Sequence, residues 1–248
     1  MQEKEHMNLC LDFGNTLCKA ALFDKDQLVD RFSFPAQQAL QAVEDIIATY
    51  APSKAILSSV INHDTAVNTL LADKCTYFHV LNEHSALPIV NAYASPGTLG
   101  MDRVALAVAA QQHYPGRNCL VISIGTAITY NFITHNKFFR GGAISPGLRL
   151  RFESLNTQTD KLPLIEEIGY VQLLGYDTES SIKSGVINGI AGELNYFIDE
   201  YEQTYEQLAV IITGGNLSFF ENKIKKQIFA DPKFLFKGLN LILDYNAQ

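Results

Sequence analysis

The chain has 248 residues and a net charge of −7, and hydrophobic residues make up 47% of it. This length provides enough core for one large domain or two small ones. The acidic composition disfavours a nucleic-acid partner, and no apolar run reaches the length that a membrane span requires. The polar, acidic start lacks the features of a secretory signal, so we expect a cytoplasmic protein.

The cysteines and histidines show no arrangement typical of a metal site. The four cysteines are scattered through apolar stretches without a CxxC pair: Cys10, Cys18, Cys75 and Cys119. Such residues behave as small buried hydrophobes in a reducing compartment. We interpret the cysteines and the six histidines as structural or solvated residues.

In the first half of the chain, strand-like and helical patterns alternate. Pro35 favours the start of the first helix, and Asp64 is the expected N-cap of the second. The expected strands are 7–14, two runs within 16–34, 54–61 and 75–81, and the expected helices are 36–50, 64–74 and 99–114.

After a break at 115–118, the order starts again. The expected strands are 119–125, 127–133, 137–144 and 207–213, and the expected helices are 146–156, 178–205, 217–229 and 237–246. The stretch 120–133 looks like a second copy of 9–23, with Gly125 in the place of Gly14, 111 residues earlier. We therefore predict an α/β fold of two similar domains, 1–115 and 116–248, with a cleft between them.

Three glycine turns at strand ends could bind a nucleotide. In "DFGNT", Gly14 would expose backbone N–H groups to phosphate, and Asp12 would need a cation between itself and that phosphate. The second turn is "IGTA" at 124–127, and the third is "ITGGN" at 212–216. Taken alone, the first turn is explained equally well as a plain hairpin and the third as a close strand–helix joint, and a plain hairpin is the better explanation of the second. The three together are more specific.

These motifs, together with "GTLGMDR", "GGAISPGLRLR" and "GYDTESSIKSG", resemble those of type III pantothenate kinases from Leu9 to Asn246. The resemblance implies two ribonuclease-H-like domains of the actin and sugar-kinase type, with ATP between them. It also implies transfer of the γ-phosphate of ATP to the primary hydroxyl of pantothenate, the first step towards coenzyme A. It further implies a homodimer with the pantothenate pocket near its interface.

The resemblance also implies roles for individual residues. Asp102 is the expected proton acceptor, and Asp12 the residue that faces magnesium. The expected nucleotide contacts are Asp12, Phe13, Gly14, Asn15, Thr16, Leu17, Cys18, Lys19, Gly125, Thr126, Gly214 and Gly215. The expected pantothenate contacts are Tyr93, Gly100, Met101, Asp102, Arg103 and Thr178. Arg103 offers a fork of donors for a carboxylate or a phosphate.

The chain departs from the family pattern at Ser123. The family has an aspartate there that helps bind a monovalent cation, potassium or ammonium, and an acidic residue often stands where this chain has Asn131. A serine hydroxyl can bond a cation weakly but cannot neutralise it. The enzyme could work without potassium, another carboxylate could reach the site, or turnover could be lost while binding is kept.

Alternative functions follow from these features. A weakened or catalytically silent relative that binds nucleotide or pantothenate is the second hypothesis, because of Ser123. Another sugar or acid kinase of the superfamily is the third, although "LGMDR" and "GGAISPG" argue against it. A nucleic-acid regulator is disfavoured by the acidic composition.

Overall fold

The computed structural model describes residues 7–248, and its chain forms two compact units. The first unit holds the residues up to His113, Lys137–Arg140 and Lys233–Gln248. The second holds Tyr114–Asn136 and Gly141–Pro232. The predicted domain boundary at 115 stays a prediction, and the C-terminal helix belongs to the first compact unit. Residues 1–6, part of the polar start used to judge secretion, lie outside the described residues.

The first unit contains a five-stranded sheet in the order β3-β2-β1-β4-β5. Strand β1 pairs antiparallel with β2 and parallel with β4. The strands are β1 (Met7–Phe13), β2 (Cys18–Asp24), β3 (Gln27–Phe34), β4 (Lys54–Ser59) and β5 (Tyr77–Val80). A short parallel pair, β6 (Val90–Asn91) with the start of β9 (Phe138–Gly141), also lies in this unit.

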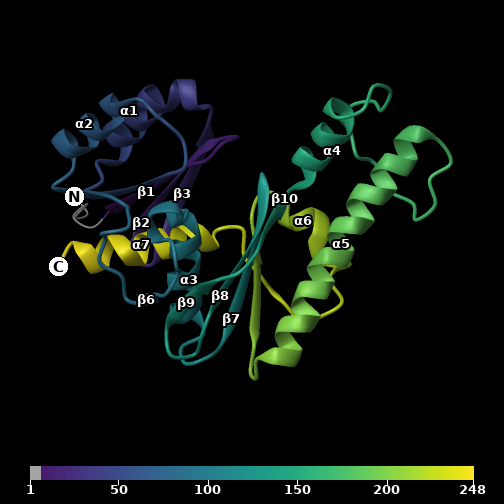
Figure 1. Ribbon diagram of the computed structural model, residues 1–248. Coiled ribbons are helices and arrows are strands. Elements are labelled where there is room, and N and C mark those ends of the chain that lie inside the picture. The colour runs from purple at the N-terminus through teal and green to yellow at the C-terminus, as the bar shows by residue number, and fades with distance from the viewer. Residues whose placement is uncertain (1–6) are drawn as a thin grey trace. The chain divides into compact units, whose positions relative to one another are not determined.

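Helices cover both faces of this first sheet (Figure 1). Alternate residues of β1 point to opposite faces. Leu9, Leu11 and Phe13 pack in one core with residues of α1 (Ala39–Tyr50) and α2 (Thr65–Lys74). The opposite face, which carries Asn8, Cys10 and Asp12, lies against α7 (Phe234–Asn246) and α3 (Met101–His113), because Asn8 Nδ2 donates to Asn240 Oδ1 of α7 and α3 packs on α7.

The second unit repeats the central pairing of the first. Strand β7 pairs antiparallel with β8 and parallel with β11, as β1 does with β2 and β4. The strands are β7 (Cys119–Ile124), β8 (Ala127–Ile133), β10 (Ile144–Pro146), β11 (Ala209–Thr213) and β12 (Phe229–Ala230). One apolar core joins β7, β8 and β11 to α4 (Leu148–Thr157), α5 (Thr178–Thr204) and α6 (Leu217–Phe220). The internal repeat read from the sequence is therefore confirmed as a repeated strand arrangement.

Two elements predicted for the second half of the chain were wrong. The helix over 217–229 ends at Phe220, continues as a 3₁₀ turn over Glu221–Lys223, and gives way to β12. Asn195 of α5 binds the carbonyl of Lys223 and the N–H of Lys225, so these backbone groups bond a side chain instead of a helix. The strand over 137–144 is broken at Gly141 and Gly142, which both have positive φ.

The remaining predicted helices and strands are present, with shifted ends. Asp64 caps α2 as predicted, because its side chain accepts from the N–H of Ala66. The last helix begins at Phe234, three residues before the predicted start. Within residues 7–248, no helix combines the length and the apolar character of a membrane span.

Candidate active site

The predicted phosphate loop is the tight turn between β1 and β2. The N–H of Gly14 donates to the carbonyl of Leu17 at 3.3 Å, which closes the turn. Asn15, Thr16 and Leu17 are exposed, whereas Phe13 and Cys18 are buried in the core. Phe13 and Cys18 can therefore reach a ligand only through their backbone groups, and the exposed turn offers N–H donors and a hydroxyl.

Asp12 and Asp102 lie near one another in the first unit. Burial and the nearby charge of Asp102 raise the pKa of Asp12 to about 7, while the charge of Lys19 acts in the opposite direction. Lys19 is the register partner of Asp12 on β2, so both side chains lie on the same face of the sheet. The carboxyl group of Asp12 is thus within electrostatic range of the Asp102 carboxylate and the Lys19 ammonium group.

Asp102 is held by the first turn of α3. Burial raises the pKa of its carboxyl group, and hydrogen bonds from backbone N–H groups, including that of Arg103, oppose this shift. A Cβ on Gly100 would stand 2.5 Å from Asp102 Oδ1, so the carboxylate folds back over a residue without a side chain. Gly100 thereby lets the acid occupy the start of the helix.

Arg103 and Tyr93, two of the expected pantothenate contacts, lie side by side. The guanidinium carbon of Arg103 lies 5.7 Å from the ring centroid of Tyr93 and 6.0 Å from that of Phe139. Arg103 is only 4% exposed, so its charge sits in an aromatic setting that strengthens cation–π attraction. Phe139 is a site neighbour that sequence reasoning missed, because nothing in its own stretch distinguishes it from a core phenylalanine.

The second and third glycine turns lie side by side in the second unit. Gly214 has φ +104°, and a Cβ on it would stand 2.5 Å from the carbonyl oxygen of Ile124. The N–H of Asn216 donates to that same oxygen at 3.1 Å. The turns at Gly125 and Gly214 are therefore packed against each other, whereas Gly215 is open, because a Cβ added there would meet nothing within 4 Å.

The turn at Thr126 is fixed by the segment around Gly147. The N–H of Gly147 donates to the carbonyl of Thr126 at 3.0 Å, and a Cβ on Gly147 would stand 2.2 Å from the oxygen of Gly125. Behind it, Glu193 of α5 accepts hydrogen bonds from Tyr130 and Ser145 and forms an ion pair with Arg151 of α4. Ser145, Gly147 and Arg151 all belong to the motif "GGAISPGLRLR", so this motif supports the turn at Thr126.

Ser123 stands among hydroxyl residues. Its register partners are Thr129 on β8 and Thr213 on β11. Asn131 donates from Nδ2 to Thr129 Oγ1 at 3.0 Å and to the carbonyl of Val121 at 3.1 Å. The neighbouring strand positions of Ser123 thus carry neutral oxygen ligands and no carboxylate.

Thr178 lies in the second unit, at the start of α5. Asp177 caps this helix by a reciprocal pair of hydrogen bonds with Ser180. Thr178 lines a pocket of about 980 Å³ with residues of α4, α5 and the loop between these helices. Its role toward pantothenate stays a prediction.

A divalent cation fits the face around Asp12, because two half-buried carboxylates meet there and burial disfavours their charge without a counter-ion. Asp12 and Asp102 are the residues that could face it. Within residues 7–248, no cluster of three or more histidine, cysteine, aspartate or glutamate side chains is placed to hold a metal unaided. Magnesium commonly binds through only one or two carboxylates plus water and phosphate.

The sequence profile of type III pantothenate kinases matches residues 8–200. The type III pantothenate kinase of Christiangramia forsetii is 42% identical over 97% of this chain and 99% of its own length. That of Phocaeicola vulgatus is 40% identical over 98% of this chain and 100% of its own length.

Solved structures show the fold. A putative Baf family transcriptional activator from Campylobacter jejuni has a TM-score of 0.62 at 22% identity, covering 96% of this chain and 98% of its own. A ROK family glucokinase from Streptomyces griseus has a TM-score of 0.55 at 12% identity, covering 98% and 99%. The predicted fold class, that of actin-like sugar kinases, is confirmed. With the profile match and the full-length relatives, the chain belongs to the type III pantothenate kinase family.

Proposed function

We propose that this chain transfers the γ-phosphoryl group of ATP to the primary hydroxyl of pantothenate, the first step towards coenzyme A. The proposal is supported by the electrostatic interaction of Asp12, on the predicted phosphate loop, with Asp102, on the predicted substrate loop. Phosphoryl transfer needs positioning and charge neutralisation more than covalent chemistry. A pair of acids with separate roles, one toward a cation and one toward a hydroxyl, meets that need.

In this proposal, the glycine turns have separate roles toward the nucleotide. Asp12 faces magnesium, which neutralises phosphate charge when it is bound. The turn from Gly14 to Lys19 supplies N–H donors and a cation, and Thr126 supplies a second phosphate contact. The backbone at Gly214 and Gly215 receives the adenosine, and the small size of both residues allows close approach.

Asp102 accepts the proton of the substrate hydroxyl and aims its oxygen. A carboxylate whose pKa is raised by burial is a better base than an ordinary aspartate. Arg103 binds the carboxylate of pantothenate, and Tyr93 holds the guanidinium by cation–π contact. Gly100 and Met101 supply the loop backbone, and Thr178 adds a substrate contact.

We also propose that activity depends weakly or not at all on a monovalent cation. Ser123, Thr129 and Thr213 offer neutral oxygens, which can bind potassium or ammonium but cannot offset its charge. The acids at positions 12 and 102 keep the magnesium and base roles, so turnover survives the change at Ser123.

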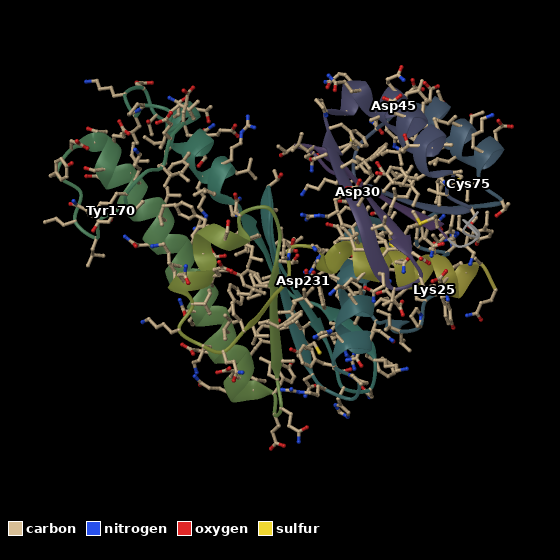
Figure 2. The ribbon with its side chains drawn as sticks, turned by 180° about the vertical axis from the view of Figure 1, so that it is seen from behind. Lys25, Asp30, Asp45, Cys75, Tyr170 and Asp231 are labelled. Carbon is tan, nitrogen blue, oxygen red and sulfur yellow. The ribbon has the colours of Figure 1, made fainter. Side chains whose placement is uncertain are left out.

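A homodimer in the cytoplasm completes the proposal. Five large apolar side chains on the loop between α4 and α5 are exposed: Leu164, Tyr170, Leu173, Leu174 and Tyr176. Figure 2 shows Tyr170 on this loop, beside the N-terminal part of α5. Such a patch is typical of a protein interface. We expect light scattering to give the molar mass of a dimer for the wild type and that of a monomer for Leu174→Glu. A monomeric mass for the wild type would refute the proposed dimer. The four buried cysteines are free thiols, as in a reducing compartment.

Acceptor-dependent ADP release tests the function. Purified chain, ATP and magnesium are incubated with pantothenate, with glucose, or without an acceptor. We expect ADP release only with pantothenate. Release with glucose alone would make the chain a sugar kinase, and binding without release would support the silent-relative hypothesis.

A further inference from the structure

Ser58 of β4 is a fully buried serine whose hydroxyl has no hydrogen bond. The residue is 0% exposed, and within residues 7–248 Ser58 Oγ has no hydrogen-bond partner. Leaving a buried hydroxyl unsatisfied is unfavourable, and native proteins rarely do so without a reason. A functional partner that binds at this place is one such reason.

The register places Ser58 beside Asp12. The two residues are partners in the parallel pairing of β1 with β4, so their side chains lie on the same face of adjacent strands. Lys19 flanks Asp12 on its other side, from β2. Ser58, Asp12 and Lys19 therefore form one row across three strands, at the carboxyl ends of β1 and β4.

The second unit repeats this feature. Thr213 stands opposite Ser123 in the parallel pairing of β7 with β11, as Ser58 stands opposite Asp12. Thr213 is also buried, at 2% exposure. Both halves thus place a buried hydroxyl residue beside the position that the repeat aligns with the acid. Packing alone would favour an apolar residue at both places.

We propose that Ser58 is a further residue of the magnesium–nucleotide site, where its hydroxyl bonds the hydration shell of the ion that Asp12 faces. The inference rests on the proposed function. Magnesium keeps several of its waters in protein sites, and each water needs an acceptor. Ser58 Oγ has both lone pairs and its proton uncommitted within the described chain, so it can serve as that acceptor.

The test compares Ser58→Ala with the wild type by calorimetry. ATP is titrated into each protein, once in the presence of magnesium and once in the presence of EDTA. We expect Mg·ATP affinity to fall about 10-fold, as for a lost hydrogen bond to a charged group. Metal-free ATP affinity should stay unchanged. The melting temperature of the ligand-free variant should equal or exceed that of the wild type, because an unsatisfied hydroxyl is removed. A residue with only a structural role would show the opposite pattern, a lower melting temperature with unchanged affinity.

Ser59→Ala is the matched control. Ser59 points to the other face of β4, and its hydroxyl donates to the carbonyl of Ile61. Its loss should leave both ATP affinities unchanged. If wild type and Ser58→Ala bind Mg·ATP equally well, the role of Ser58 is refuted while the proposed function stands. If the wild type fails to bind Mg·ATP, both are refuted.

Discussion

Asp12 on β1 and Asp102 on α3 are electrostatically coupled. Burial, and then the charge of Asp102, raise the pKa of Asp12 from 3.8 to about 7. The two acids are separated by about 90 residues in sequence, and the covering of the first sheet by α3 and α7 brings them together. A cation bound between the two carboxylates would offset both the cost of burying their negative charges and the repulsion between these charges. The pair is therefore suited to bind a cation.

The pH dependence of Mg·ATP affinity should follow the protonation of the Asp12 carboxyl group. Because its pKa is near 7 in the ligand-free protein, Asp12 becomes protonated as the pH falls below 7, and affinity should fall with it. Asp102→Asn removes a charge that raises this pKa, so the midpoint should move to lower pH. Calorimetric titrations between pH 5 and pH 9 measure both midpoints. Identical midpoints would contradict the coupling.

Asp12→Asn should stabilise the ligand-free protein at high pH. The folded state binds the Asp12 proton more tightly than the unfolded state, so stability falls as the pH rises from about 4 to 7. The asparagine variant lacks this penalty and should exceed wild-type stability above pH 7 by up to about 4 kcal/mol, with no gain below pH 4. Urea unfolding at several pH values measures this. A variant less stable at pH 8 would contradict it.

Gly147→Ala should disrupt the turn at Thr126. Its Cβ would stand 2.2 Å and 2.4 Å from the carbonyl oxygens of Gly125 and Thr126, so the turn must move. We expect ATP affinity to fall at least about 10-fold, as for the loss of about 1.4 kcal/mol. Gly189→Ala is the control, because nothing lies within 4 Å of its Cβ position on α5. That change should stabilise the fold by about 0.5–1 kcal/mol. Equal ATP affinity in both variants would refute the role of Gly147.

Ser123→Asp should introduce sensitivity to potassium. A carboxylate beside Thr129 and Thr213 would give the hydroxyl cluster the charge that it lacks. Steady-state rates measured over a range of potassium concentrations should change little for the wild type and rise for the variant. A steep potassium requirement in the wild type would contradict the account, and a flat response in the variant would place the cation site elsewhere.

Much of the fold could be read from the sequence, because strand and helix periodicities are local properties. The repeat around Gly14 and Gly125 also predicted the shared strand pairing that the structure shows. The prediction of a helix over 217–229 was wrong because backbone groups of Lys223 and Lys225 form hydrogen bonds with the side chain of Asn195, which is distant in sequence. No local pattern carries that information.

The site was predictable only in part. Motif resemblance predicted Asp12, Asp102, Arg103 and Tyr93 as site residues, and the structure places all four in one unit. It gave no indication of Ser58 or Phe139, because strand register places Ser58 beside Asp12 and tertiary packing places Phe139 beside Arg103. A serine within the apolar run of β4 was the only sequence signal for Ser58, and serines in strands are common.

In the proposed reaction, Asp102 serves phosphoryl transfer to pantothenate. Phosphorus NMR of a reaction with ATP, magnesium and pantothenate detects the product directly and locates its phosphate. We predict phosphopantothenate, phosphorylated at the primary hydroxyl, from the wild type. We predict that Asp102→Asn binds ATP normally but forms this product about 10²–10⁴ times more slowly, the usual contribution of a general base. An unchanged rate in Asp102→Asn, or no phosphopantothenate from a wild-type protein that binds ATP, would contradict the account.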